Sequence, residues 1–149
     1  MALISLREFA DRIGTVMPVI TREFARRQIH DLYRSRITLA QFFVLEYLHA
    51  HGETKMTALA QFMRVSTAAM TGIVERLVRE HAVTRIFDDA DRRIIKVRLT
   101  AKGEKFVRKM NDQRRRMVIH IFDRISARDR SAYLRILMQI QEILCRERP

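Results

Sequence analysis

Apolar residues near the start of the chain recur at steps of three and four, the spacing of one face of an α-helix. Pro18 interrupts this stripe, and a proline inside a helix removes one backbone hydrogen bond and clashes with the preceding turn. The pattern therefore predicts either a helix kinked near Met17 or two helices, with Pro18 in the first turn of the second. The stripe consists of Leu6, Phe9, Ile13, Val16, Ile20 and Phe24.

Helical spacing and capping residues predict five more helices. Thr38, Ser66 and Ser126 are small polar residues of the kind that accept the first free amides of a helix. Gly52 and the residues after it interrupt the apolar pattern, as expected at a helix end. The predicted helices cover about 39–50, 55–63 and 66–81, then a stretch from Thr100 past residue 121, and a last one from Ser126 past residue 144.

Residues 83–99 change to the period-two alternation of strands. Val83 to Phe87 is one predicted strand and Ile95 to Leu99 the other, with an acidic turn at residues 88–91 between them. The two helices before this hairpin are joined only by Arg64 and Val65, which predicts a helix-turn-helix with the hairpin as its wing. The fold class is therefore mainly α: a winged helix-turn-helix domain with a two-stranded β wing and flanking N- and C-terminal helices.

Composition indicates a class of partner and a compartment. The 149 residues favour one domain, and the net charge of +12 indicates a polyanionic partner, nucleic acid first and a membrane surface second. Cys145 is the single cysteine, so no internal disulfide forms. The sequence has no signal-peptide core and no apolar run long enough for a bilayer, so we expect a cytoplasmic protein with no membrane segment.

Two motifs resemble the MarR family of winged-helix transcriptional regulators. Residues 66–77, Ser-Thr-Ala-Ala-Met-Thr-Gly-Ile-Val-Glu-Arg-Leu, resemble its recognition helix. The wing Asp91-x-Arg93, followed by Val97-x-Leu99-Thr100-x-x-Gly103, is the more specific motif. His81 and Ala82 depart from the pattern, because family members often have Gly-Leu or Gly-Ile there. The resemblance implies a DNA-binding transcriptional regulator.

The predicted recognition helix would enter the major groove with its N-terminal residues toward the base edges. Thr hydroxyls bond several bases, and Ala or a Thr methyl contacts a thymine methyl. Gly72 weakens a helix, so it serves either a close approach to DNA or tight packing against another helix. Arg76, with Arg79 beyond it, would reach phosphates or form a solvated basic face. The residues assigned to this contact are Ser66, Thr67, Ala68, Thr71, Gly72 and Arg76.

Arg93 is expected at the wing tip, where a guanidinium fits a narrow minor groove. The resemblance implies that the Asp91 carboxylate holds this guanidinium in a bidentate pair; the alternative is an ion pair that only stabilises the hairpin. Arg92 and Lys96 are expected to add phosphate contacts, which position the protein without reading sequence.

One helix-turn-helix reads only a few base pairs, so a symmetric homodimer on a pseudo-palindromic site is expected. The expected division is 1–36 and 104–149 for dimerisation helices and 37–103 for the DNA-binding lobe. The resemblance also suggests a repressor that is released by a small, phenolic or anionic effector. Polar groups for such a ligand are His30, Tyr33 and Arg114.

Other classes of function have less support in the sequence. No glycine-rich phosphate loop or catalytic constellation is present, so an enzyme is not expected, and no cofactor is implied. A zinc site from His49, His51, His120 and Cys145 is disfavoured, because His49 and His51 point to different sides of a helix. A membrane-surface protein needs a basic amphipathic helix, and the basic stretch 22–36 fits a dimer helix better.

Overall fold

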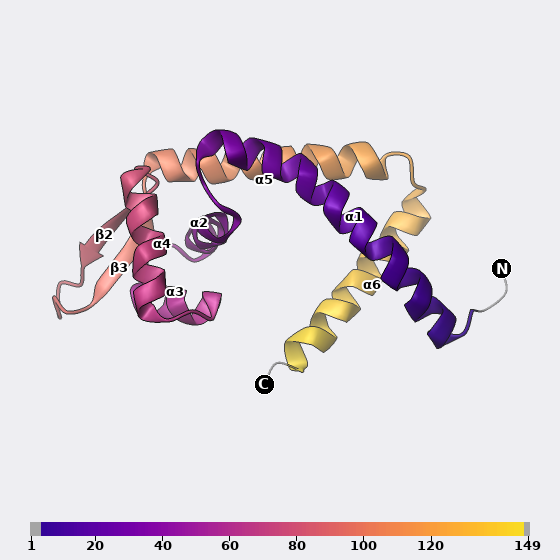
Figure 1. Cartoon of the computed structure of the whole chain (residues 1–149), viewed down its shortest axis with the longest axis horizontal. Coiled ribbons are helices and arrows are strands. Elements are labelled where there is room, and N and C mark those ends of the chain that lie inside the picture. Colours follow the sequence, from indigo (N-terminus) through magenta and orange to yellow (C-terminus); the bar gives the residue numbers. More distant parts are fainter. Residues whose placement is uncertain (1–3, 148–149) are drawn as a thin grey trace. The chain divides into compact units, whose positions relative to one another are not determined.

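The structure, a computed structural model, describes residues 4–147, and for residues 27–35 the backbone but not the side chains. Its elements fall into two compact units, Met1–Met110 and Asn111–Pro149. Helix α5 begins in the first unit and ends in the second. In chain order the elements are α1 (Leu6–Ser35), α2 (Leu39–His51), β1 (Thr54–Lys55), α3 (Met56–Met63), α4 (Thr67–Arg79), β2 (Val83–Phe87), β3 (Ile95–Leu99), α5 (Ala101–Phe122) and α6 (Ala127–Arg146) (Figure 1).

Helix α1 runs without a break through Pro18, so the alternative of two separate helices is wrong. Ser5 caps it, and its side chain accepts a hydrogen bond from the Glu8 amide at 3.2 Å. The apolar stripe of its first four turns is exposed, with Phe9 retaining 47% and Ile13 41% of their accessible surface. This apolar face of α1 is therefore largely uncovered in the described part of the chain.

The buried core runs from Ile37, just before α2, to Met110 in α5. Thr38 and Gln41 form a capping box at the start of α2, which explains why the nearly fully buried Gln41 is polar. Leu59 and Ala60 of α3 face inward. The largest completely enclosed side chains are Leu45, Leu48, Leu59, Met70, Leu77, Val44, Val74, Val97 and Val107.

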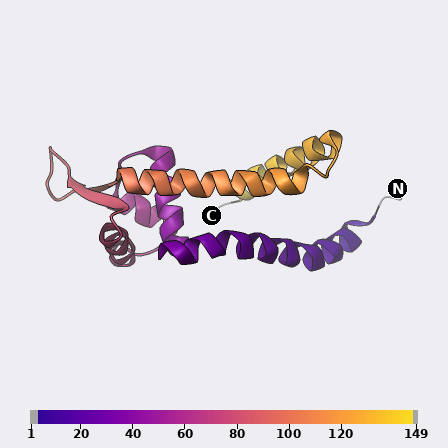
Figure 2. The ribbon, with the colours of Figure 1, turned by 90° about the horizontal axis from the view of Figure 1, so that it is seen from above.

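The sheet has three strands in the order β1-β3-β2, whereas the sequence predicted only the two strands of the wing. Strands β2 and β3 pair antiparallel from Val83↔Leu99 to Phe87↔Ile95, and the short β1 pairs with β3 at Thr54↔Val97. A two-residue strand is too short to show alternation, and the predicted helix 55–63 already includes its second residue, Lys55. The β2–β3 hairpin projects beyond the helices of the lobe (Figure 2).

The end of α4 is joined to the start of α5 by a dense set of backbone contacts. The Thr100 hydroxyl donates to the His81 carbonyl at 2.6 Å, and the Thr100 amide donates to the Ala82 carbonyl at 3.0 Å. The same hydroxyl accepts from the Gly103 amide at 3.1 Å and so caps α5, as predicted. A Cβ at Gly103 would overlap the Ala82 carbonyl oxygen and lie 3.2 Å from Cδ2 of Leu99.

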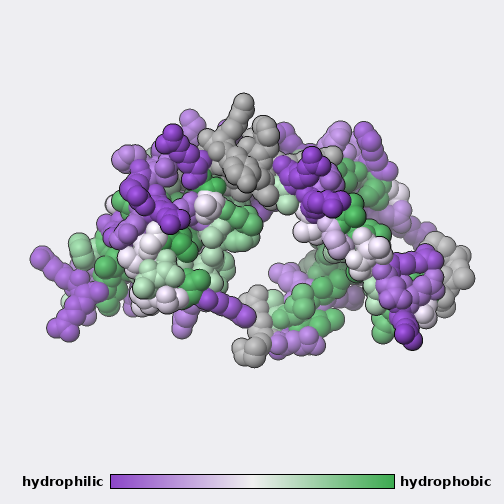
Figure 3. Space-filling view, viewed as in Figure 1, coloured by the Kyte–Doolittle hydropathy of each residue, from purple (hydrophilic) through white to green (hydrophobic). Residues whose placement is uncertain are grey.

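The second unit is held together mainly at the turn between α5 and α6. Ser126 caps α6 through the Asp129 amide at 3.1 Å, and Arg130 donates to the Phe122 carbonyl at 3.0 Å. The rings of Phe122 and Tyr133 lie 5.5 Å apart. No residue of α6 is buried among the described residues, and apolar side chains cover much of its visible surface (Figure 3).

The contact at Gly103 predicts a destabilised variant. Gly103→Ala forces its methyl group against a backbone carbonyl, and we expect a loss of about 1–3 kcal/mol in the free energy of unfolding, measured by urea denaturation. Gly72→Ala is the matched control, because open space surrounds that position. The control should gain about 0.5–1 kcal/mol from helix propensity alone. Equal stabilisation of both variants would contradict the packing role of Gly103.

Candidate nucleic-acid interface

The recognition helix α4 is set by a tight turn after α3. Arg64 adopts a left-handed conformation at φ 53°, and the Val65 amide donates to the Ala60 carbonyl at 3.0 Å, which closes the end of α3. Ser66 then begins α4, and its hydroxyl accepts from the Ala69 amide at 3.1 Å. Ser66 is thus engaged as an N-cap, which leaves the next residues to present their side chains outward.

One face of α4 is packed and the opposite face is free of protein. Met70, Val74 and Leu77 are fully buried. Residues 68, 72, 76 and 79 follow at steps of three and four on the other side of the helix. Thr67, Ala68 and Arg76 are exposed, whereas Thr71 is half-buried and donates its hydroxyl to the Thr67 carbonyl at 2.9 Å.

Gly72 has no neighbour within 4 Å of the position that a Cβ would take. The alternative that this glycine allows tight packing against another helix is therefore wrong within the described structure. The residue leaves a local gap on the outward face of α4, where a side chain would add bulk toward any ligand of that face.

Arg76 also contributes to a shallow basic pocket beside the recognition helix. Arg36 and Arg79 line the pocket with it, together with Thr38 and Gln41 at the amino end of α2 and the acidic Glu80. Three guanidinium groups against one carboxylate leave the lining with a net positive charge, which suits a phosphate oxygen.

The wing loop is organised by its aspartates. One carboxylate oxygen of Asp88 accepts from the amides of Ala90 at 3.0 Å and Asp91 at 3.3 Å, and the Asp91 carboxylate accepts from the Arg93 amide at 3.0 Å. These contacts lower the pKa of Asp88 below its usual range, with the hydrogen bond from Lys96 as the largest cause. Side chains and backbone thus fix a loop that has no regular structure.

Arg92 and Arg93 are exposed in this loop, and the tip of the wing is hydrophilic (Figure 3). The implied ion pair between Asp91 and the Arg93 guanidinium is not formed among the described residues, because Asp91 binds the backbone amide of Arg93 instead. The Asp-x-Arg spacing therefore serves the turn, and the guanidinium remains available for an external partner.

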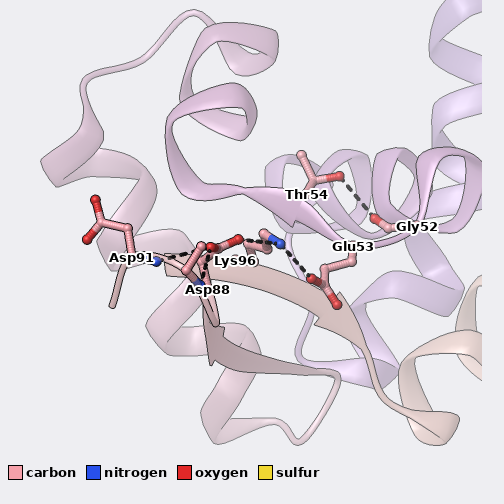
Figure 4. Close-up of polar contacts among 7 residues, drawn as sticks. Gly52, Glu53, Thr54, Asp88, Asp91 and Lys96 are labelled. Atoms are coloured by element: carbon pink, nitrogen blue, oxygen red, sulfur yellow. Dashed lines mark hydrogen bonds and ion pairs between the residues drawn. The ribbon is translucent and has the colours of Figure 1, made fainter. Parts of the chain in front are cut away.

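Lys96 points away from the loop tip and lies between two carboxylates (Figure 4). Its ammonium is 2.6 Å from Asp88 Oδ2 and 3.3 Å from Glu53 Oε1. Both contacts raise the pKa of Lys96, the one with Asp88 more strongly. The predicted wing residues thus divide into two exposed arginines and one lysine that is engaged inside the protein.

Sequence reasoning did not single out Arg85, which links the wing to the recognition helix. Its guanidinium lies 3.6 Å from the Glu75 carboxylate and donates to the Thr71 carbonyl at 3.5 Å. Glu75 belongs to α4 and Arg85 to β2. The sequence did give a hint of this role, because Arg85 is a charged residue in the middle of a predicted strand. One face of such a strand packs against a helix, and a charged side chain on that face finds its partner there.

The residues expected at an effector site are only partly described. The side chains of His30 and Tyr33 lie outside the described residues, although both belong to α1. Arg114 lies in α5 and donates to Asn111 Oδ1 at 2.7 Å. Of the histidines considered for zinc, His49 contacts Glu104 at 3.0 Å and His51 contacts the Tyr47 carbonyl at 2.9 Å. Among residues 4–26 and 36–147, whose side chains are described, no group of three or more potential metal ligands is found.

The helix-turn-helix, the hairpin beside it and the exposed arginines together define a winged helix-turn-helix DNA-binding protein. The profile of the MarR family matches residues 37–95. The HTH-type transcriptional regulator YpoP of Bacillus subtilis (strain 168) is 30% identical over 98 residues, 66% of this chain and 70% of YpoP. The chain belongs to the MarR family.

Two further similarities concern regulation and fold. The HTH-type transcriptional repressor MdtR of Bacillus subtilis (strain 168) is 33% identical over 76 residues, 51% of this chain and 49% of MdtR. A crystallised MarR family protein from Bacillus stearothermophilus superposes with a TM-score of 0.83 over 96% of this chain and 99% of its own, at 22% identity. The protein is therefore a DNA-binding transcriptional regulator and not an enzyme. None of the helices, as far as residues 4–147 describe them, is long and apolar enough to cross a membrane.

The open space at Gly72 predicts that stability and DNA affinity respond in opposite directions. Gly72→Gln should raise the free energy of unfolding by about 0.5–1 kcal/mol, because glutamine favours a helix more than glycine does. Its side chain should keep α4 away from the bases and weaken binding at least about tenfold. Gly14→Gln in α1, where open space also surrounds the glycine, is the control. Undiminished binding by Gly72→Gln, measured by fluorescence anisotropy, would rule out a close approach at this position.

Proposed function

We propose that the protein reads a pseudo-palindromic operator by inserting α4 into the major groove and the wing arginine Arg93 into the adjacent minor groove. The observation that carries this proposal is the outward face of α4, on which Thr67, Ala68 and Arg76 are exposed, on the same lobe as the exposed arginines of the wing. Thr67, Ala68, Thr71 and Gly72 are small enough to let the helix approach base edges.

Phosphate contacts complete the proposed interface. Arg92 in the wing loop and Arg76 beside the basic pocket supply guanidinium groups on two sides of α4. Such contacts fix the register of a protein on the duplex but carry no sequence information. The net charge of +12 supports this electrostatic part of the binding.

A homodimer is the proposed assembly, with 37–103 as the DNA-binding lobe and the segments 1–36 and 104–149 as dimerisation helices. Support comes from the apolar faces of α1 and α6, which an isolated chain exposes to water. On α6 these side chains are 37–61% accessible, and burying such surface against a second copy is favourable. They are Tyr133, Leu134, Ile136, Leu137, Met138, Ile140, Ile143 and Leu144.

Repression with release by a small anionic ligand is the proposed mode of regulation. The similarity to MdtR, which is named a repressor, supports the first part. A dimer seated on an operator that overlaps a promoter excludes the polymerase. Resemblance to the MarR family supports a phenolic or other anionic effector, for which His30, Tyr33 and Arg114 are the proposed polar groups.

The role of the wing is tested with Arg93→Ala on a duplex selected by the protein from random-sequence DNA. Specific affinity should fall by about 1–3 kcal/mol, because the variant lacks the guanidinium that we place in the minor groove. Folding should change little, because this guanidinium has no partner among the described residues. Lys109→Ala, an exposed lysine of α5, removes the same charge away from the wing and should change affinity far less. An equal loss in both variants, or a parallel loss of helicity by circular dichroism in Arg93→Ala, would contradict minor-groove insertion.

The dimer is tested by placing a charge on the apolar face of α6. Ile140→Glu should shift the protein to a monomer in sedimentation equilibrium and abolish binding to the full operator, because a buried unpaired carboxylate is costly. Gln139→Glu adds the same charge to the exposed residue next to it and should remain a dimer. A dimeric Ile140→Glu variant, or a wild-type protein that sediments as a monomer, would exclude α6 as the interface.

A further inference from the structure

Lys96 is the one wing residue predicted to bind DNA whose charge is already engaged inside the protein. The side chain of Lys96 is 27% exposed, and its two acidic partners are 20% (Asp88) and 38% (Glu53) exposed. Two carboxylates at 2.6 Å and 3.3 Å surround one ammonium, so the cluster as a whole carries a net negative charge. A phosphate would be repelled by that cluster, whereas the solvated guanidinium groups of Arg92 and Arg93 would attract it.

The two acids belong to different parts of the lobe. Asp88 lies at the start of the wing loop. One of its carboxylate oxygens pairs with the Lys96 ammonium, while the other accepts hydrogen bonds from the amides of Ala90 and Asp91. A single carboxylate thus joins the lysine to the backbone that carries Arg92 and Arg93.

Glu53 lies in the corner between α2 and β1, and this corner is itself fixed. Gly52 has a positive φ of 72°, its amide donates to the Leu48 carbonyl at 2.8 Å, and its carbonyl accepts the Thr54 hydroxyl at 3.0 Å. Two residues after Glu53, Lys55 pairs with Lys96 itself in the β1–β3 ladder. The backbone that carries Glu53 is therefore held on the body of the lobe.

We propose that Lys96 is a positioning residue that ties the wing loop, through Asp88, to the α2–β1 corner, through Glu53, and so sets the direction in which the wing arginines project (Figure 4). The proposal rests on the proposed function, in that the arginines are useful only if the wing meets DNA. Lys96 acts through Asp88 and does not itself contact a phosphate.

A loop that is not held in place loses conformational entropy when it binds a ligand, and this loss weakens the complex. The strand ladder of the wing ends at Phe87 and Ile95. Beyond it, the Asp88 amide donates to the Ile94 carbonyl at 3.0 Å and the Ile94 amide to the Asp91 carbonyl at 2.9 Å, while the Asp88 and Asp91 side chains accept further amides of the loop. A tie to the body of the lobe orders the loop before binding, which strengthens a complex without adding a contact to the ligand.

The experiment compares Lys96→Met and Glu53→Gln with Asp89→Asn, using anisotropy titrations on the selected duplex over a series of salt concentrations. Asp89 is an exposed acid of the same loop with no hydrogen bond or ion pair among the described residues. Removing a carboxylate near DNA normally tightens binding, and Asp89→Asn should do so. Glu53→Gln should instead weaken binding, because it releases the wing from the corner.

Lys96→Met should lose about tenfold in affinity and keep the wild-type slope of log affinity against log salt, because no phosphate contact is lost. The double variant Lys96→Met/Glu53→Gln should bind no more weakly than Lys96→Met alone. In NMR titrations of the full chain, the pKa of the Asp88 carboxyl should rise toward its usual value in Lys96→Met, and Lys96→Arg should restore both affinity and the low pKa.

Two results would overturn the inference while leaving DNA binding intact: a salt slope reduced by about one in Lys96→Met, as for a direct phosphate contact, or tighter binding by Glu53→Gln. Full affinity in Lys96→Met would overturn it as well. Failure of the proposed function is distinct from these, because the wild-type protein would then select no duplex or Arg93→Ala would bind as tightly as wild type.

Discussion

The packing of Gly103 against the Ala82 carbonyl is the constraint on which the geometry of the lobe depends. It lets α5 start directly against the residues that end α4, with Thr100 bonded to His81 and Ala82 at the same point. Recognition helix, wing and α5 therefore meet at one junction. A small displacement there changes the angle between the two parts that we propose enter neighbouring grooves.

His81 shows how this junction accommodates an unusual residue. It follows α4 in a left-handed conformation at φ 57°, where glycine avoids a cost of about 1 kcal/mol. The Ala82 amide donates to the Leu77 carbonyl at 2.9 Å and the His81 amide to the Val78 carbonyl at 2.9 Å, the pattern that closes many helices. The departure from the usual Gly-Leu or Gly-Ile thus leaves the turn in place, and surrounding contacts offset its cost.

Most of the fold followed from local signals in the sequence. Ser66 and Thr38 predicted helix starts because capping depends on one side chain and two nearby amides, and β2 and β3 were predicted at their observed bounds because alternation is clear over five residues. Strand β1 was missed because two residues carry no period. The apolar spacing did not decide whether α1 continues through Pro18, because the same stripe fits one kinked helix and two helices.

The sequence predicted which types of residue lie in the candidate site, but it did not predict which partner each side chain contacts. The sequence placed basic residues in the wing, yet it could not tell that Asp91 binds an amide, that Lys96 faces two carboxylates, or that Arg85 reaches α4. Those partners are set by which strand face meets which helix. The open side of Gly72 likewise became clear only from its surroundings.

Simultaneous reading of two grooves by α4 and the wing is the central claim, and methylation protection on the selected operator tests it most directly. We expect guanine N7 in the major groove and adenine N3 in the flanking minor groove to be protected together, in two half-sites about 34–36 Å apart. Protection confined to the major groove, or a single half-site, would contradict it.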